Sequence, residues 1–324
     1  MCRSASLTSA SPATGAPIRW KVDPSGTPRF DRMRISVVVP TRGRAMLLER
    51  CLDALAVQDI DEPYEVIVVD DGAQEAATTS LRDGLEVKLL RSFGRGPAGA
   101  RNVGVAAASG EIVLFTDDDT VPGRHWVRAA VAYLDEHPDH VGVEGWTTTD
   151  AFDPLYEHSI HSRGGHAFLT CNIAYRRETM GRLGGFFEGF PYPHCEDLDL
   201  GFRALRVGEI GTCPAMVVEH PPRAVGIGDI VRRGRLAASE LRLIARHPDR
   251  YLNGASARPA AVVIRGFGVR WVRRAAQERR ALIRSPRRAT RFAVAAVGQV
   301  TLAIATVAAE VLRTLRARCS ERSS

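Results

Sequence analysis

Three consecutive aspartates follow a short apolar segment of this 324-residue chain. Asp117, Asp118 and Asp119 repel one another, so a fold that places them together usually supplies a cation. Carboxylate oxygens are hard ligands that suit Mg²⁺ or Mn²⁺, and such ions commonly hold phosphate groups. The run therefore predicts a site for a metal-bound phosphorylated ligand, and a solvated acidic turn is the alternative interpretation.

A second acidic cluster contains Glu196, Asp197 and Asp199 and is followed by Arg203. The spacing of four residues places Asp199 and Arg203 on one helix face, where they can form an ion pair. Glu196 and Asp197 then stand at the first turn, where a carboxylate can serve as a general base for a nearby proton. The alternative is structural, because an aspartate at this position also caps a helix.

Two further features carry positive charge or a metal-binding group. Residues 94–102 are rich in glycine and are expected to open a helix, whose free N–H groups favour anions, with Arg95 or Arg101 adding positive charge. This segment lacks both the P-loop and the dinucleotide-binding pattern. His220 follows an expected strand, and the alternatives for it are a satisfied structural histidine or a ligand for an ion of the Mn²⁺ class.

The elements that must position these groups alternate along the first half of the chain. Apolar runs predict strands over 35–39, 65–69, 85–90 and 111–115, with helical spacing over 45–57 and 98–108. Such alternation predicts a parallel sheet with helices on both faces. Ligands of open sheets bind beyond the carboxyl ends of the strands, which is where Thr41, Asp70, Asp71 and the aspartate run fall.

Farther along the chain we expect a helix over 126–137, strands over 141–148 and 168–175, a helix over 196–205 and a strand within 209–218. The domain organisation follows: a leader over 1–33, an α/β domain over 34–222 and a helical extension over 223–324. The leader is rich in Ser, Ala, Pro and Thr and lacks the apolar core of a signal peptide, so we expect it to be mobile and not to direct secretion.

The charge is distributed unevenly. The last 102 residues, from Arg223 onward, contain 22 Arg, no Lys and six acidic residues, whereas the preceding part is net acidic. Such a tail suits an anionic membrane surface or an acidic substrate, and a solubilising helical face is the alternative. No aromatic-interleaved or zinc-finger pattern accompanies the arginines, so we expect no nucleic-acid partner.

Residues 292–309 form an uncharged run of 18 residues with arginines on both sides. This length is at the lower edge for a membrane-spanning helix. Three interpretations therefore remain: a helix that spans a membrane, one that lies on its surface, and one packed on the protein body. We expect a cytoplasmic protein that is peripheral at the inner face of the plasma membrane.

The motifs together resemble the family 2 glycosyltransferases, which have the GT-A fold, a Rossmann-like and mostly parallel sheet with helices on both faces. The resemblance rests on Ser36–Arg44, Val68–Gly72, Gly99–Asn102 and Asp117–Asp119. The later block, residues 171–203, resembles the acceptor-side half of the family and is also similar to a segment of galactosyltransferase-type enzymes. The match covers roughly residues 34–220, and the leader and tail lie outside it.

This resemblance implies an inverting transfer of a sugar from a nucleotide-diphosphate sugar to an acceptor hydroxyl, assisted by Mn²⁺ or Mg²⁺. UDP is the expected nucleotide, with GDP and dTDP open, and the acceptor is expected to be a lipid-linked or cell-envelope glycan. The implied roles are nucleotide-sugar binding by Thr41, Arg44, Asp70, Asp71, Arg101, Asp117 and Asp118; metal binding by Asp119, Asp117 and His220; catalysis by Asp197 as general base with Glu196; and acceptor-side contacts by Asn172, Trp146 and Arg203.

Two other functions remain in competition. A sugar-phosphate nucleotidylyltransferase also uses a Rossmann-like sheet, but the chain lacks the glycine- and Lys/Arg-rich opening loop of those enzymes. A catalytically silent nucleotide-sugar-binding scaffold would keep the sheet, and the carboxylates present at all matched positions argue against it.

Overall fold

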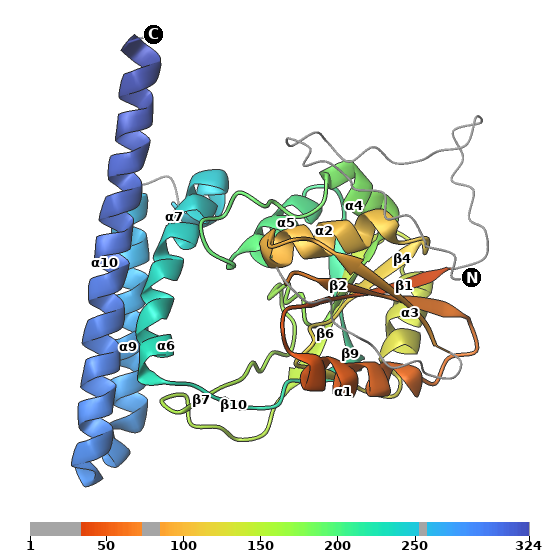
Figure 1. The fold of residues 1–324 in the computed structure, drawn as a ribbon, viewed down its shortest axis with the longest axis horizontal. Coiled ribbons are helices and arrows are strands. Elements are labelled where there is room, and N and C mark those ends of the chain that lie inside the picture. The colour runs from red at the N-terminus through yellow and green to blue at the C-terminus, as the bar shows by residue number, and fades with distance from the viewer. Residues whose placement is uncertain (1–33, 73–84, 253–257, 324) are drawn as a thin grey trace, which may run out of the picture.

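A computed structural model describes residues 34–72, 85–252 and 258–323, with side chains described up to residue 316. The expected leader over 1–33 lies outside the described residues. Figure 1 shows two parts, an α/β domain built on a twisted sheet and a group of helices at the C-terminal end.

The main sheet has eight strands in the order β3-β2-β1-β4-β8-β6-β9-β5. The first four in that order are mutually parallel, as the sequence predicts, whereas β8 is antiparallel to both neighbours and β5 pairs antiparallel with β9. A separate two-stranded sheet joins β10 and β7. The strands are β1 (Ile35–Thr41), β2 (Tyr64–Asp70), β3 (Glu86–Arg91), β4 (Ile112–Phe115), β5 (Val121–Pro122), β6 (His140–Thr148), β7 (Glu157–His158), β8 (Ile173–Arg176), β9 (Glu209–Glu219) and β10 (Arg223–Ala224).

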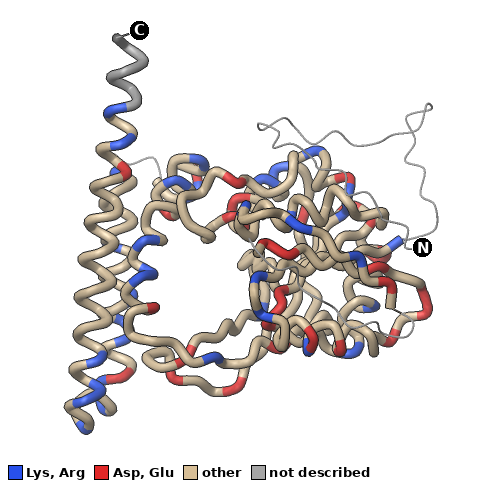
Figure 2. Tube along the Cα trace, viewed as in Figure 1, with Lys and Arg blue, Asp and Glu red and all other residues tan. Residues whose placement is uncertain are grey.

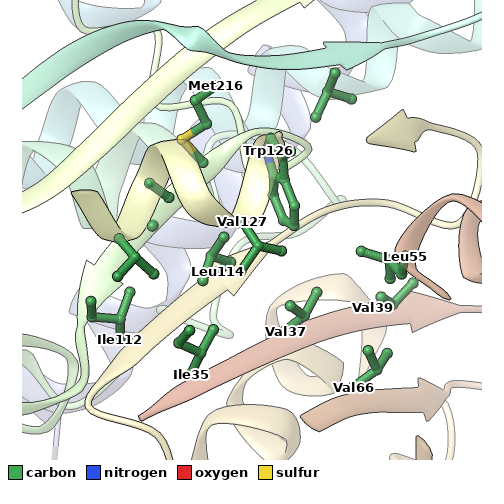
Figure 3. Close-up of a cluster of buried hydrophobic side chains, with 14 of the residues drawn as sticks. Ile35, Val37, Val39, Leu55, Val66, Ile112, Leu114, Trp126, Val127 and Met216 are labelled. Atoms are coloured by element: carbon green, nitrogen blue, oxygen red, sulfur yellow. The ribbon is translucent and has the colours of Figure 1, made fainter. Parts of the chain in front are cut away.

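Five helices cover the two faces of the main sheet. Helices α1 and α3 pack on one face, where Val37 and Val39 of β1 share a buried cluster with Leu55 and Trp126 (Figure 3). Helices α2, α4 and α5 pack on the other face, against the alternate residues of the same strands. Burial on both faces explains why β1 and β2 are continuous apolar runs. The helices are α1 (Ala45–Ala56), α2 (Gly96–Ala107), α3 (Trp126–Glu136), α4 (Arg177–Leu183) and α5 (Glu196–Ala204).

One predicted strand is mostly wrong. The strand expected over 168–175 begins only at Ile173, because the residues before it form a loop. Phe168 has a positive φ of 51°, and its N–H donates to the Glu144 carboxylate at 3.0 Å instead of to a neighbouring strand. A charged side chain buried in β6 thus replaces the strand hydrogen bond that the apolar pattern had suggested.

The C-terminal residues are helical, as predicted from their spacing. They form α6 (Ile227–Arg232), a 3₁₀ turn η1 (Arg233–Leu236), α7 (Ala237–Arg246), α8 (Pro248–Tyr251), α9 (Pro259–Arg284) and α10 (Pro286–Ser323). Helices α9 and α10 run side by side, with α6 and α7 between them and the sheet domain (Figure 1). Residues 286–316 of α10 are long and apolar enough to cross a membrane by length and composition, with 17% of the most apolar stretch buried.

Polar contacts attach these helices to the sheet domain both near the start of α10 and near the end of α7. At one, Arg291 Nε donates to the Leu155 carbonyl at 2.8 Å and Arg288 pairs with Asp153. At the other, the fully buried carboxylate of Asp199 accepts hydrogen bonds from Arg246 of α7 at 2.6 Å and from His247 at 2.9 Å. The second contact is notable because Asp199 belongs to the same helix, α5, as Glu196 and Asp197.

Candidate active site

A cleft of about 690 Å³ opens beyond the carboxyl ends of β1, β2 and β4. The strand ends, the start of α2 and the loop before α5 form its walls, and the ends of β7 and β9 close one side. Of the residues predicted from the sequence, the cleft is lined by Thr41, Arg44, Asp71, Arg101, Asp117, Asp118, Asp119, Glu196 and His220.

The aspartate run lies on the cleft wall, and arginines neutralise it. Asp118 is buried and accepts hydrogen bonds from the Thr41 hydroxyl at 2.7 Å and from Arg44 at 3.0 Å. Arg44 also reaches Asp119, at 2.8 Å. Burial raises the pKa of Asp118 to about 6, although Arg44 and the Thr41 hydroxyl act in the opposite direction. Thr41 and Arg44 therefore hold the run in place from the end of β1.

Arg101 connects the aspartate run to the second acidic cluster. Its guanidinium is buried, and its two terminal nitrogens contact different carboxylates, Asp117 at 2.7 Å and Glu196 at 3.2 Å. Burial alone would lower the pKa of Arg101, but these carboxylates outweigh it and raise the pKa. Two motifs that lie far apart in the sequence therefore meet on one side chain of α2.

The carboxylates of α5 differ in their access to the cleft. Glu196 lines it, and the buried Oε2 atom of Glu196 has no hydrogen-bond partner among the described residues. Asp197 is only partly buried and does not line the cleft, and its Oδ1 accepts the N–H of Leu198 at 2.8 Å. Burial, with the neighbouring Glu196 carboxylate, raises the pKa of Asp197 to about 6.

The residues proposed for a metal approach one another at the end of the aspartate run. His220 Nε2 lies 3.9 Å from Asp119 Oδ1, and Arg223 Nε lies 3.8 Å from the other oxygen of Asp119. Two ligands at about 2.1 Å from one ion stand at most about 4.2 Å apart, so the carboxylate and the imidazole fit a single divalent ion. In the described part of the chain, no group of three or more His, Cys, Asp and Glu side chains forms a fuller cage.

Asp71 also lines the cleft and is held in part by the backbone of the glycine-rich segment. One of its oxygens accepts the Gly96 N–H at 3.0 Å and the other accepts the Ser92 hydroxyl at 2.5 Å. Asp70, directly before it, is buried outside the cleft lining, and its Oδ1 accepts the N–H of Gly72 at 2.8 Å. Of Asp70 and Asp71, only Asp71 therefore lines the cleft, where a ligand can reach it.

Comparisons with known proteins agree with this geometry. A family model described as glycosyl transferase family 2 matches residues 36–194, the segment that supplies most of the cleft. Residues 36–194, just under half of the chain, are therefore similar to glycosyltransferase family 2. The GT-A fold of the chain is also that of the mannosyltransferase PcManGT from Pyrobaculum calidifontis, solved with GDP-Man and Mn²⁺, at a TM-score of 0.52 and 22% identity over 84% of this chain and 87% of that one.

Relatives with assigned names include two glycosyltransferases of different organisms. The chain is 29% identical over 252 residues to a pre-mycofactocin glycosyltransferase of Mycobacterium tuberculosis, covering 70% of this chain and 50% of that protein. It is 33% identical over 171 residues to the glycosyltransferase AglE of Haloferax volcanii, covering 47% of this chain and 55% of that one. The chain thus spans about half the length of these relatives.

Three residues predicted to lie on the acceptor side are outside the cleft lining. Asn172 is buried and binds Trp126 Nε1 at 2.8 Å and the Trp146 carbonyl at 2.9 Å. The Trp146 ring lies under the Arg163 guanidinium, 5.4 Å from it. Arg203 forms the predicted pair with Asp199, at 2.8 Å. Each of these side chains supports the fold around the site.

The structure adds cleft residues that the motifs did not single out. An aromatic wall comes from the loop before α5, whose Phe187, Phe190 and Tyr192 line the cleft. The Tyr192 backbone is held from α7, because Ser239 Oγ accepts its N–H at 3.1 Å and donates to its carbonyl at 2.9 Å. The richness of residues 181–189 in Gly and Phe was the one sequence signal for this wall. Arg95 of the glycine-rich segment also lines the cleft, and the further lining residues include Arg42, His158, Ile160, Glu188 and Arg223.

Proposed function

We propose that this chain is a family 2 glycosyltransferase that moves a sugar from a nucleotide-diphosphate sugar to an acceptor hydroxyl with inversion at the anomeric carbon. The observation that supports this most strongly is the shared cleft, in which Arg101 joins Asp117 of the aspartate run to Glu196 of α5. The donor diphosphate lies beside the aspartate run, and the acceptor hydroxyl lies beside the carboxylates of α5.

The transfer needs one carboxylate base and no enzyme nucleophile. The acceptor O–H gives its proton to the base, and the acceptor oxygen attacks the anomeric carbon from the face opposite the diphosphate. The bond between that carbon and the diphosphate oxygen breaks, and its electron pair leaves with the nucleoside diphosphate. A positioned base of this kind typically contributes about 10²–10⁴-fold in rate.

The base belongs to the pair Glu196 and Asp197, and different properties support each member. Asp197, the base implied by the sequence resemblance, has a pKa of about 6, so it is mostly ionised and still basic at neutral pH. Glu196 has direct access to the cleft and a carboxylate oxygen without a protein partner. The two assignments are separated by the variants described below.

Asp119 and His220 would hold the divalent ion, Mn²⁺ or Mg²⁺, with Asp117, two residues before Asp119, as a further ligand. Bound there, the ion supplies positive charge to the departing diphosphate. Asp71, Thr41 and Arg44 form the nucleotide side of the cleft. UDP remains the first donor to test and GDP the second, because the structural neighbour from P. calidifontis was solved with GDP-Man.

The acceptor is proposed to be a glycan, free or linked to a lipid of the cell envelope. The wall formed by Phe187, Phe190 and Tyr192 supports a sugar, because aromatic side chains combine an apolar face with, in tyrosine, a polar tip that suits carbohydrate rings. The galactosyltransferase-type character of residues 171–203 is part of this proposal.

The experiment measures nucleotide release from UDP-sugars and GDP-mannose with Mn²⁺, together with donor binding by calorimetry. We compare wild type with Glu196→Gln and Asp197→Asn, and use Glu136→Gln, an exposed position at the end of α3, as the matched control. The base is the residue whose variant loses at least about 10²-fold in turnover while it still binds donor.

Three outcomes contradict the proposal in different ways. Wild-type turnover in both variants removes the base assignment. Donor binding by wild type without any nucleotide release supports a silent scaffold. Pyrophosphate release from a nucleoside triphosphate and a sugar 1-phosphate supports a nucleotidylyltransferase.

A further inference from the structure

The outer face of α10 is apolar along most of the helix. Its exposed residues recur at steps of three and four, which places them on one side of the helix. Between residues 292 and 309 this face carries no charged residue. A water-exposed surface of this length normally contains charges, so another apolar surface is expected to cover it. The exposed residues of the face, named here the α10 stripe, are Val294, Val297, Thr301, Ile304, Ala308, Val311 and Leu315.

Arginines border the α10 stripe at both ends, as the blue segments on either side of the tan middle of α10 show in Figure 2. At the C-terminal end of the stripe, next to Val311 and Leu315, Arg313 and Arg316 are exposed. At the other end, the exposed arginines near the α9–α10 turn are Arg279, Arg280, Arg284 and Arg287. An apolar stripe between groups of arginines is the composition of a helix that lies in a membrane interface and meets anionic headgroups.

The packing of α10 argues against a spanning arrangement. Gly234 of η1 sits directly against the backbone of α10 at Gln299 and Ala303, in the middle of the uncharged run. Its neighbours Arg233 and Arg235 are therefore level with the centre of that run. If α10 crossed a bilayer in this packed form, these arginines would lie at the depth of the hydrocarbon centre, where charged side chains are strongly disfavoured.

A second copy of the chain fits the stripe less well than lipid. A two-helix seam is normally bordered by charged side chains that select the partner and its direction. Here the positions beside the stripe, including Ala293, Val300, Ala305 and Leu312, are themselves uncharged. A broad uncharged face that lacks bordering charges to select a partner helix fits a lipid surface better than a second copy of the chain.

We infer that α10 lies in the plane of an anionic lipid surface, with the α10 stripe buried among the acyl chains and the bordering arginines at the headgroups. The sheet domain then stays wholly on one side of the bilayer, held off the lipid by α6 and α7. This inference concerns the helical extension alone and does not depend on the proposed glycosyl transfer.

The first test is vesicle flotation of the full chain. We compare vesicles of phosphatidylcholine with vesicles that also contain phosphatidylglycerol, and wild type with Val297→Glu. The matched control is Val57→Glu on the sheet domain, because Val57 is 61% exposed and Val297 is 67% exposed. We expect wild type and control to float with the anionic vesicles, and Val297→Glu to bind about tenfold more weakly, since it places a charge in the buried stripe.

The second test asks whether the chain lies on the bilayer or crosses it. Alkaline carbonate treatment of membranes from cells that produce the chain releases surface-bound proteins, so we expect wild type in the soluble fraction. Retention in the membrane pellet would overturn the in-plane arrangement. Equal flotation with both vesicle types, or equal flotation of Val297→Glu and wild type, would also overturn the inference.

Analytical ultracentrifugation tests whether a second copy of the chain, instead of lipid, covers the α10 stripe. A wild-type dimer that Val297→Glu converts to monomer, combined with no flotation of either form, would assign the stripe to a second copy and reject the membrane surface.

Discussion

Replacement of Arg101 by methionine tests whether this side chain joins the two halves of the site. Methionine keeps an unbranched side chain of similar length in the interior but removes both ion pairs. The carboxylates of Glu196 and Asp117 then lose their common cation, while their exposed fractions are 10% and 27%. The fold must therefore accommodate at least one poorly solvated negative charge.

The magnitude follows from that burial. Removal of one partner from a buried ion pair typically costs about 3–5 kcal/mol. Water reaches part of Asp117, and the substitution also removes the Arg101 Nε atom, which is buried without a partner in the described residues. Both effects favour the lower end, so we expect a loss of about 3 kcal/mol in the free energy of unfolding. For a domain of this size that corresponds to a fall in Tm of about 6–12 °C.

The assay is urea unfolding at neutral pH in a double-mutant cycle with Glu196→Gln. Because the glutamine removes one unpaired charge, it should recover at least about 1 kcal/mol in the Arg101→Met background. The control is Arg128→Met, which breaks the ion pair with Asp59 at the surface, where the two side chains are 53% and 41% exposed. That variant should lose less than about 1 kcal/mol. Equal losses for Arg101→Met and Arg128→Met, or additivity in the cycle, would refute the bridging role.

Two other predictions concern the supports of the site. Burial tends to raise the pKa of Asp199, but Arg246, Arg203 and His247 outweigh it and hold the pKa below its ordinary value. The stabilisation by the ionised Asp199 carboxylate is therefore present above the pKa that this group has in the unfolded chain, and it is lost as the pH falls through the lower pKa of the folded protein. In urea unfolding, Asp199→Asn should cost about 3 kcal/mol at pH 7. The cost should be smaller below about pH 4. A pH-independent cost would contradict the ion pairing. A methyl group at Gly104 of α2 would overlap the Val38 side chain of β1. Gly104→Ala should therefore lower the free energy of unfolding by about 1–3 kcal/mol. It should also reduce turnover, because Arg101 lies one helical turn earlier and would be displaced. Thermal melts of both variants test this, with Gly266→Ala in α9 as the control. An added methyl group at Gly266 meets no atom within 4 Å, so this variant should be neutral or stabilising. Similar losses for both variants would exclude packing as the cause.

Much of the sheet domain could be predicted from the sequence because local chemistry determines it. The runs that form β1, β2 and β4 are apolar on both faces, and helical spacing identified α1, α2 and α3 within a few residues. The strand predicted from Phe168 was mostly wrong, because the Glu144 side chain takes the Phe168 N–H that a strand would have given to its neighbour. A periodicity rule cannot detect a hydrogen bond to a carboxylate that lies far away in the sequence.

The sequence by itself determined the types of charged group in the site and the edge of the sheet where they gather, since the carboxyl ends of parallel strands meet there. Only the tertiary structure decided how these groups are paired. Arg101 forms ion pairs with Asp117 and Glu196, whereas Arg44 forms ion pairs with Asp118 and Asp119. The tertiary structure also separated Glu196, which lines the cleft, from Asp197, which does not, and placed Asn172 and Arg203 in supporting contacts. The physical reason is that side-chain direction and burial depend on elements packed together from distant parts of the chain.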